Sequence, residues 1–557
     1  MKWTALRALV AILGISGAAA AAGTGDPLMP ADAPPRPALA PVKPVTETLW
    51  GKKVTDNYRY MEALDPSTIA WMKAEGAYTR SILDAIPLRA ALEKKVAAFT
   101  GSFGFTQGYV KFGGRAFYEE RAPGSDNFDL IVSDGAGTRK LVDVSALRAA
   151  NGGKPYAINY FLAAPDGSKV AVGISQGGSE DASIRVYDAA TGKGIAGPID
   201  RAQFGATAWS NDSNTLYFIR LKKLAPTDAP TERYKDALLV SWNLKSEPTP
   251  ILGSTVGHGP KFGPDETPAL GIVPGVPVAL ALSINGVQNE QALWLAPADK
   301  VDDPNVEWKP FVTRDDDVTS EDAEGDHIFL LSHKNAPTFQ VLSVKVGEPY
   351  SSAKVLVPAK GDRVIDSVHA AADALYVLAR TGAYSQLLRV PYGSADIQEI
   401  ALPFKGHVAE AFTDQRAPGI TLELESFVVP PTTFAYDPAK GSFTDLHLGV
   451  TPPYDSSRYT VRDLEAKAED GVMVPDSLVM PKSAKGPQIM LIQAYGSYGI
   501  SQLADFSPRA VSFLEAGGAM PPVMCAAAAN WAMRGGSPAR MRTRSTPGAI
   551  SSLAART

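Results

Sequence analysis

The sequence is poor in the residues that build disulfide frameworks, metal sites and membrane spans. Its 557 residues hold one cysteine, Cys525, so no internal disulfide is available to the fold. The apolar stretch at Ala8–Ile15 is too short to cross a bilayer. Six histidines show no spacing typical of metal ligands, so we expect no metal site and treat them as ordinary surface or strand residues: His258, His327, His333, His369, His407 and His447.

Excess charge is also missing. The formal net charge is -5, which gives no reason to expect binding to nucleic acid or to an anionic membrane. The chain is 45% hydrophobic and 20% charged, values typical of a soluble globular protein. Its length predicts two or three domains.

The N-terminus has the layout of a secretory signal peptide. Lys2 and Arg7 precede the apolar stretch, and small residues follow at Ala18–Ala22. We expect a signal peptide over residues 1–22, a mobile Pro- and Ala-rich leader over 23–44, and a secreted or periplasmic protein that has no membrane contact after cleavage. A membrane-anchored N-terminus is the alternative.

Residues 45–105 predict a helical segment after an initial loop. Asp65 followed by Pro66 is typical of a helix start, because the carboxylate caps free N–H groups and proline suits the first turn. The first helix is expected to run through Leu83, and Pro87 to open a second one. The apolar residues of the two helices recur at helical spacing: Ile69, Trp71 and Met72, then Leu88, Leu92, Val96 and Phe99.

Residues 106–455 consist of short strands with period-2 alternation, separated by turn sequences such as Pro165-Asp166-Gly167. Seven units share one layout, in which an apolar strand, a turn and a second strand follow one another, as in Lys169–Gly173 and Ser183–Tyr187. At roughly 50 residues a unit, they predict a seven-bladed β-propeller. A pair of β-sandwiches is the alternative.

Two motifs in this region are expected to carry no chemistry. Gly173–Gly177 matches the G-x-S-x-G pattern of a nucleophile elbow, but a polar turn and another strand follow it instead of a helix. We interpret it as a loop between two blade strands. The acidic run Asp315–Asp317 lacks the glycine and the closing glutamate of a calcium loop and is expected to be a solvated loop.

The stretch Pro487–Gly518 is typical of a buried strand that feeds a functional loop. An apolar run, Ile489–Ile492, ends in a turn rich in glycine and tyrosine, Ala494–Gly499. Central strands covered on both faces read as continuous apolar runs, and the loops after such strands form the active sites of open α/β sheets.

The order of parts, with a helical preface, a propeller and then an α/β segment, resembles the prolyl oligopeptidase family of serine peptidases. The resemblance covers about residues 44–518. The segments that carry it are Asp56–Glu62 with Asp65-Pro66 and Trp71, Glu469–Pro475, Tyr495–Gly499, Phe506–Arg509 and Phe513–Gly518.

The resemblance implies a mixed fold: a seven-bladed β-propeller over 106–455 and the start of an α/β-hydrolase domain over 456–518, incomplete here, with its N-terminal helical part at 45–105. It implies hydrolysis of short peptides by a Ser-Asp-His triad, after proline in the namesake members and after basic residues in a related branch. By motif match, Tyr495 donates a hydrogen bond to the oxyanion and Tyr498 lines the substrate pocket. The alternative is that both tyrosines only pack the strand end. No cofactor is implied, and a monomer is expected.

Residues 519–557 do not continue the family pattern. They contain no Asp, Glu or Lys, and no histidine follows His447, so the triad is absent from the chain as written. Reading two bases later turns Asn530-Trp531-Ala532 into a forced Leu-Gly, and lets Met520–Trp531 encode Ala-Ala-Cys-His-Val-Arg-Gly-Gly-Gly-Glu-Leu-Gly, which contains the family segment. We expect this tail to be a frameshifted reading, and the chain as written to be inactive and poorly soluble.

Two functions remain open at this point. One is a periplasmic prolyl-type peptidase that is truncated in this chain. The other is a secreted propeller that binds peptides or glycans without catalysis, or a pseudogene product.

Overall fold

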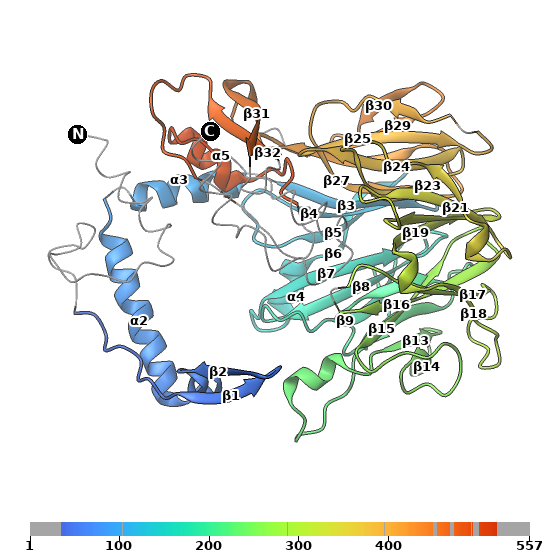
Figure 1. Cartoon of the computed structure of the whole chain (residues 1–557), viewed down its shortest axis with the longest axis horizontal. Coiled ribbons are helices and arrows are strands. Elements are labelled where there is room, and N and C mark those ends of the chain that lie inside the picture. The colour runs from blue at the N-terminus through green and yellow to red at the C-terminus, as the bar shows by residue number, and fades with distance from the viewer. Residues whose placement is uncertain are drawn as a thin grey trace.

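Seven four-stranded antiparallel sheets dominate the chain, in a computed structural model that describes residues 35–87, 89–102, 104–286, 288–394, 396–448, 454–467, 473–491, 493 and 501–520 (Figure 1). In every sheet the four strands are neighbours in sequence order, which is the arrangement of a propeller blade. The expected seven-bladed propeller is therefore confirmed, and the sandwich alternative is wrong.

The strands of the first four blades are short, and a helix follows blade 1. Their bounds are β3 Phe105–Phe112, β4 Arg115–Arg121, β5 Asp129–Asp134 and β6 Gly137–Val142, then α4 Val144–Ala150; β7 Tyr156–Ala163, β8 Lys169–Gln176, β9 Ser183–Asp188 and β10 Gly194–Ile199; β11 Ala206–Trp209, β12 Leu216–Arg220, β13 Leu238–Trp242 and β14 Thr249–Gly253; β15 Glu266–Ile272, β16 Val278–Asn285, β17 Ala292–Pro297 and β18 Lys309–Val312.

The last three blades repeat this layout. Their bounds are β19 Val318–Glu324, β20 His327–Ser332, β21 Gln340–Lys345 and β22 Lys354–Val357; β23 Val364–Ala370, β24 Ala374–Thr381, β25 Tyr384–Pro391 and β26 Gln398–Ile400; β27 His407–Phe412, β28 Ile420–Ser426, β29 Val429–Asp437 and β30 Ser442–Asp445. Single 3-10 turns lie at η2 Pro230–Tyr234, η3 Arg314–Asp316, η4 Tyr350–Ser352 and η5 Ser456–Arg458.

The apolar core of the propeller lies between successive blades. One cluster, for example, joins Phe329 and Val341 of blade 5 to Ile365 and Val377 of blade 6. This burial follows from the sequence, because alternate residues of each strand point to opposite faces and both faces of a blade meet a neighbour. The turn glycines serve the same packing: Gly167 has φ of +70°, and a Cβ there would lie 2.3 Å from the Phe112 carbonyl oxygen in blade 1.

The ring closes between blade 1 and blade 7 through side chains and not through a shared strand. The rings of Phe112 and Phe412 meet edge to face, with centroids 5.2 Å apart. The Gly108 N–H donates a 2.6 Å hydrogen bond to the Glu410 carboxylate. Closure therefore depends on a few contacts between β3 and β27.

The N-terminal segment is helical as expected, with one correction. The 3-10 turn η1 Arg59–Ala63 is followed by the helices α2 Pro66–Ala85 and α3 Arg89–Ser102. Asp65 caps α2 by accepting a 2.7 Å hydrogen bond from the Thr68 N–H. The expected initial loop is instead a hairpin, β1 Val45–Leu49 and β2 Lys52–Asp56. Its β-branched strands meet at Trp50-Gly51, where both φ angles are positive, as a two-residue hairpin turn requires.

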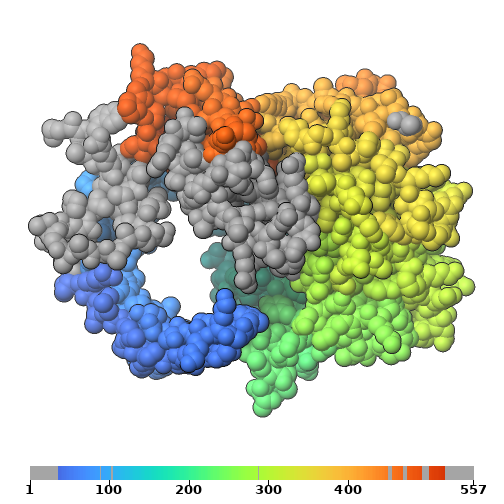
Figure 2. Space-filling view, in the orientation of Figure 1, coloured from blue at the N-terminus to red at the C-terminus, as the bar shows by residue number. Residues whose placement is uncertain are grey.

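The apolar face expected on α2 is partly exposed. Ile69 and Met72 are 39% and 51% accessible to solvent. Figure 2 shows an opening between this N-terminal segment and the blades of the propeller. Among the described residues, no helix is long and apolar enough to cross a membrane.

After the propeller, a hairpin and one helix complete the described chain. β31 Tyr459–Lys467 pairs with β32 Met473–Pro481, and α5 Pro508–Glu515 follows. Ser507 accepts a 3.3 Å hydrogen bond from the Ala510 N–H and so caps α5. In Figure 1 this region lies at the edge of blades 6 and 7.

Candidate functional site

The loop that carries Tyr495 and Tyr498 lies outside the described residues. Its two ends are described at Gln493 and Ser501. The positions of these ends, and the groups around them, define the candidate site.

The segment before the loop is not the buried strand that the apolar run predicted. Met490 forms an isolated parallel bridge with Ala519, supported by hydrogen bonds from the Leu491 N–H to the Ala519 carbonyl at 3.0 Å and from the Ala519 N–H to the Ile489 carbonyl at 2.9 Å. Met490 is 36% exposed. Within the described part of the chain nothing pairs with the other edge of this segment, which explains its exposure.

These bridges join four segments in a definite order. Met520 pairs antiparallel with Val479 of β32, through mutual hydrogen bonds of 2.7 and 2.8 Å. The order across the sheet is therefore β31, β32, residues 519–520 and residues 489–491. Helix α5 lies in sequence between the two parallel segments, as parallel pairing requires, because their connection must cross over the sheet.

The segment after the loop is attached to blades 6 and 7. Arg380 of β24 donates to the Ser501 hydroxyl at 3.3 Å, and the Ala504 N–H donates to the Ala383 carbonyl at 3.2 Å. Asp505 pairs with His407 of β27. The end of the loop is thus fixed to the propeller and not only to its own sheet.

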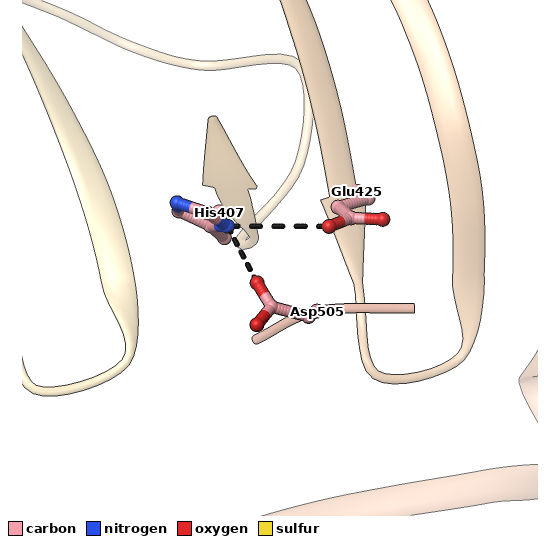
Figure 3. A group of neighbouring side chains, drawn as sticks. All are labelled: His407, Glu425 and Asp505. Atoms are coloured by element: carbon pink, nitrogen blue, oxygen red, sulfur yellow. Dashed lines mark ion pairs between the residues drawn. The ribbon is translucent and has the colours of Figure 1, made fainter. Parts of the chain in front are cut away.

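His407, Glu425 and Asp505 form a cluster at this attachment (Figure 3). The His407 Nδ1 lies 2.7 Å from Asp505 Oδ1 and 4.0 Å from Glu425 Oε1, and β28 supplies the glutamate. Burial raises the pKa of Glu425 to about 7, and the nearby Asp505 charge adds to this, while a hydrogen bond from the Phe506 N–H opposes it. Sequence reasoning treated His407 as ordinary, since ligands this far apart along the chain leave no spacing signal.

A second group of acids surrounds a cavity of about 240 Å³ between blades 1 and 7. Glu410 and Glu423 line it together with Tyr109. Burial raises the pKa of Glu423 to about 8, helped by the charges of Glu410 and Glu425. Burial also raises the pKa of Glu119, a close neighbour of Glu410. The raised pKa of Glu423 favours its neutral form at pH 7, so the cavity offers a negative charge from this residue only above about pH 8.

The described residues contain no complete hydrolytic triad. Ser367 and His369 of β23 share a 2.8 Å hydrogen bond, and burial lowers the pKa of His369 to about 4. No described carboxylate orients the ring, as a triad requires. Ser175, in the G-x-S-x-G motif, is buried inside strand β8, so the expected loop is instead a blade strand. A turn and strand β9 follow it, and not the helix of a nucleophile elbow.

The acidic run Asp315–Asp317 has a structural role and is less exposed than expected. Asp316 is largely buried, accepts from Thr313 in a capping box and pairs with Lys334 at 2.8 Å. Local sequence predicted a solvated loop, because the partner lysine lies 18 residues away.

The chain matches a known family along most of its length. The family model described as "Prolyl oligopeptidase, N-terminal beta-propeller domain" matches residues 37–239 and 279–447. A curated peptidase of Sinorhizobium fredii, y4qF, is 23% identical over 508 residues, which cover 85% of this chain and 63% of the relative. A prolyl endopeptidase of Elizabethkingia meningoseptica is 21% identical over 481 residues, covering 85% and 66%.

Solved structures agree on the fold. A structure from a study of two prolyl endopeptidases and their inter-domain dynamics has a TM-score of 0.80 at 20% identity. The match covers 93% of this chain and 76% of the other chain. Oligopeptidase B from Leishmania major has a TM-score of 0.73 at 17% identity, with coverage of 87% and 71%. The chain spans just under two thirds of the length of the curated relatives named above.

Proposed function

The chain belongs to the prolyl oligopeptidase family, and from this membership we propose that the intact protein is a serine-type oligopeptidase that cuts short peptides after proline. The observation that carries the proposal is the match of the family's propeller model to residues 37–239 and 279–447. The sheet of residues 459–520 is a second, weaker support, because Ala519 and Met520 lie in the tail proposed below to be out of frame. Two of its segments pair in parallel with a helix in their connection, which is typical of an α/β sheet. This pairing supports the proposal that the region after the propeller is the start of a catalytic domain.

Tyr495 is proposed as the oxyanion donor of this domain, and Tyr498 as a wall of the substrate pocket. A phenol placed at the oxyanion stabilises charge that develops only in the transition state, so it acts on kcat more than on KM. The triad serine, aspartate and histidine are proposed to lie in sequence that this chain does not contain, because no histidine follows His447.

Enzymatic assay of the uninterrupted gene product tests this assignment. With a Gly-Pro anilide as substrate, Tyr495→Phe should lower kcat about 10²- to 10³-fold with little change in KM. Tyr498→Ala should raise KM, whereas Tyr498→Phe should preserve it. Equal kcat in the wild type and the Tyr495→Phe variant would remove the proposed role.

We further propose that residues 519–557 are read out of frame and that the chain as written does not hydrolyse peptides. Resequencing the locus checks the first point: a one-base correction should restore the His-Val-Arg-Gly-Gly-Gly-Glu-Leu-Gly segment after Gly518, a nucleophile elbow and a late histidine. Hydrolysis of the anilide by the purified chain, blocked by a serine-directed phosphonate, would contradict the second.

Secretion to the periplasm and a monomeric state are part of the same proposal. The charged start and apolar stretch of residues 1–22 support secretion. Cell fractionation and N-terminal sequencing of the mature protein should find it in the periplasm with a start near residue 23. Sedimentation should give the mass of one chain.

A non-catalytic peptide-binding propeller is the second candidate, favoured by the cavity that Glu410 and Glu423 line. In that case the chain as written should bind a lysine-containing tetrapeptide at pH 9, above the Glu423 pKa of about 8, and Glu423→Gln should weaken that binding. A peptidase propeller with no binding role of its own predicts no measurable affinity in either form.

A further inference from the structure

We propose that His407, Glu425 and Asp505 bind one Zn²⁺ ion, which ties β27 and β28 of blade 7 to the segment that follows the Tyr495 loop. The proposed peptidase chemistry needs no metal, so this site is independent of it. The ion would be a structural link and not a catalytic group.

The geometry brings three metal-ligating atoms together from three separate segments. One donor atom from each residue lies within 4.8 Å of the other two. Bonds of about 2.0–2.2 Å in a tetrahedral site place ligand atoms roughly 3.3 Å apart. The separations of 2.7 and 4.0 Å from His407 Nδ1 lie on either side of that value, so small side-chain rotations suffice. Figure 3 shows one oxygen of each carboxylate directed toward the His407 ring.

The hydrogen-bonding state of His407 is the second observation. Its Nδ1 is fully buried, yet it has no partner with hydrogen-bond geometry in the described structure, although Asp505 is in contact. A lone pair directed at a metal would satisfy this nitrogen without a hydrogen bond.

The cluster holds two acidic groups and one imidazole. The Glu425 side chain is 10% exposed, so nine tenths of it is removed from water. Among the described residues, neither Glu425 nor Asp505 pairs with a lysine or an arginine, and the nearby Arg380 is already paired with Asp366. A divalent cation offsets two carboxylates that one imidazole cannot fully neutralise.

The donor set selects the metal. One imidazole nitrogen and two carboxylates are ligands that suit Zn²⁺, with water in the fourth position, whereas Ca²⁺ and Mg²⁺ prefer oxygen ligands alone. The Asp505 side chain is 57% exposed, which gives the ion a route from solvent and makes binding reversible. Because Asp505 belongs to the segment that begins at Ser501, the bound ion would hold that segment against blade 7.

Metal titration of the full chain tests the site. After chelation, the protein should bind one Zn²⁺ per chain in calorimetry, and its midpoint of thermal unfolding should rise on addition of Zn²⁺. Co²⁺ should give the visible absorption typical of a tetrahedral site. Asp505→Asn, an isosteric change at an exposed position, should weaken Zn²⁺ binding at least 10-fold and remove the Co²⁺ spectrum.

His447→Ala is the matched control, since His447 is an exposed histidine 3.4 Å from Asp445. It should bind Zn²⁺ as the wild type does, while His407→Ala should not bind. Should His407→Ala fail to fold, the Asp505→Asn result stands alone. Equal Zn²⁺ affinity in the wild type and Asp505→Asn, or no stoichiometric uptake by the wild type, would leave a plain His407–Asp505 ion pair and overturn the proposal. These readouts need no peptidase activity, so they fail independently of the proposed function.

Discussion

The propeller and residues 459–520, which follow it, bury their apolar side chains against different kinds of partner. Each blade buries its apolar side chains against the next blade of the same ring. The later region has no such repeat. Its core joins Val479, Val511 and Leu514 to Phe427 and Val428 of blade 7, with Phe99 of α3 packed against it. The ring supplies its own partners, whereas residues 459–520 depend on partners from elsewhere in the chain.

This difference indicates which part of the fold resists local unfolding and which part unfolds more easily. A four-stranded blade has every inner strand paired on both sides, but the 489–491 segment is held by a single bridge. Regions with few buried contacts open at lower free energy than the rest of a protein. The candidate site therefore lies at the boundary between the closed propeller ring and residues 459–520, which pack against it.

The largest effect is expected inside the ring. Phe218→Ala removes a fully buried ring that packs against Trp242, and should lower the free energy of unfolding by about 3–5 kcal/mol. Urea unfolding followed by far-UV circular dichroism measures the change. Phe204→Ala, at a half-exposed phenylalanine, is the control and should cost less than about 1 kcal/mol. Equal losses would contradict the strong-core view of the ring.

A cavity in the later region should act locally. Leu514→Ala in α5 should cost about 2–4 kcal/mol, and amide hydrogen exchange should accelerate in β31 and β32 but not in β12 and β13. Exchange that accelerates equally in both places would mean that the two regions form one cooperative unit.

The cavity between blades 1 and 7 should make stability depend on pH. The folded-state pKa of Glu423 is about 8, above its ordinary value of 4.5, so folding takes up a proton between these values. The stability due to this proton is complete below pH 4.5 and is lost as pH rises through 8. Glu423→Gln should flatten the decline by about 1 kcal/mol per pH unit, as urea midpoints at several pH values would show. The exposed Glu399→Gln should leave it unchanged.

The smallest expected loss of stability comes from removing one helix-capping interaction in each region. Asp143 caps α4 beside blade 1 by accepting from the Ala146 N–H at 2.8 Å, and Ser507 caps α5. Replacement of either by alanine should cost about 1 kcal/mol. Hydrogen exchange should locate the loss of Asp143→Ala in α4 and that of Ser507→Ala in α5 and the 519–520 pairing. Faster hydrogen exchange in blade 1 of the Ser507→Ala variant would contradict the separation of the two regions.

Most of the architecture could be predicted because its signals are local. Period-2 strands with turn residues predicted the seven blades, and Asp65-Pro66 predicted the start of α2 at Pro66. The hairpin at Val45–Asp56 was missed although its β-branched residues were visible, since the Trp50-Gly51 turn gave a weaker signal than Asn-Gly. The apolar run at Ile489–Ile492 predicted a buried strand, whereas its described residues, Ile489–Leu491, are exposed or only partly buried, because burial depends on what covers a strand and not on its composition.

The sequence by itself therefore determined the ring of blades, the helical preface and the family, since these depend on residues close together along the chain. Only the tertiary structure decided which distant groups meet. The convergence of His407, Glu425 and Asp505, the parallel pairing of Met490 with Ala519, and the raised pKa of Glu423 all depend on separate segments that folding brings into contact. Desolvation and charge interactions act over distances in space, and no spacing along the sequence encodes them.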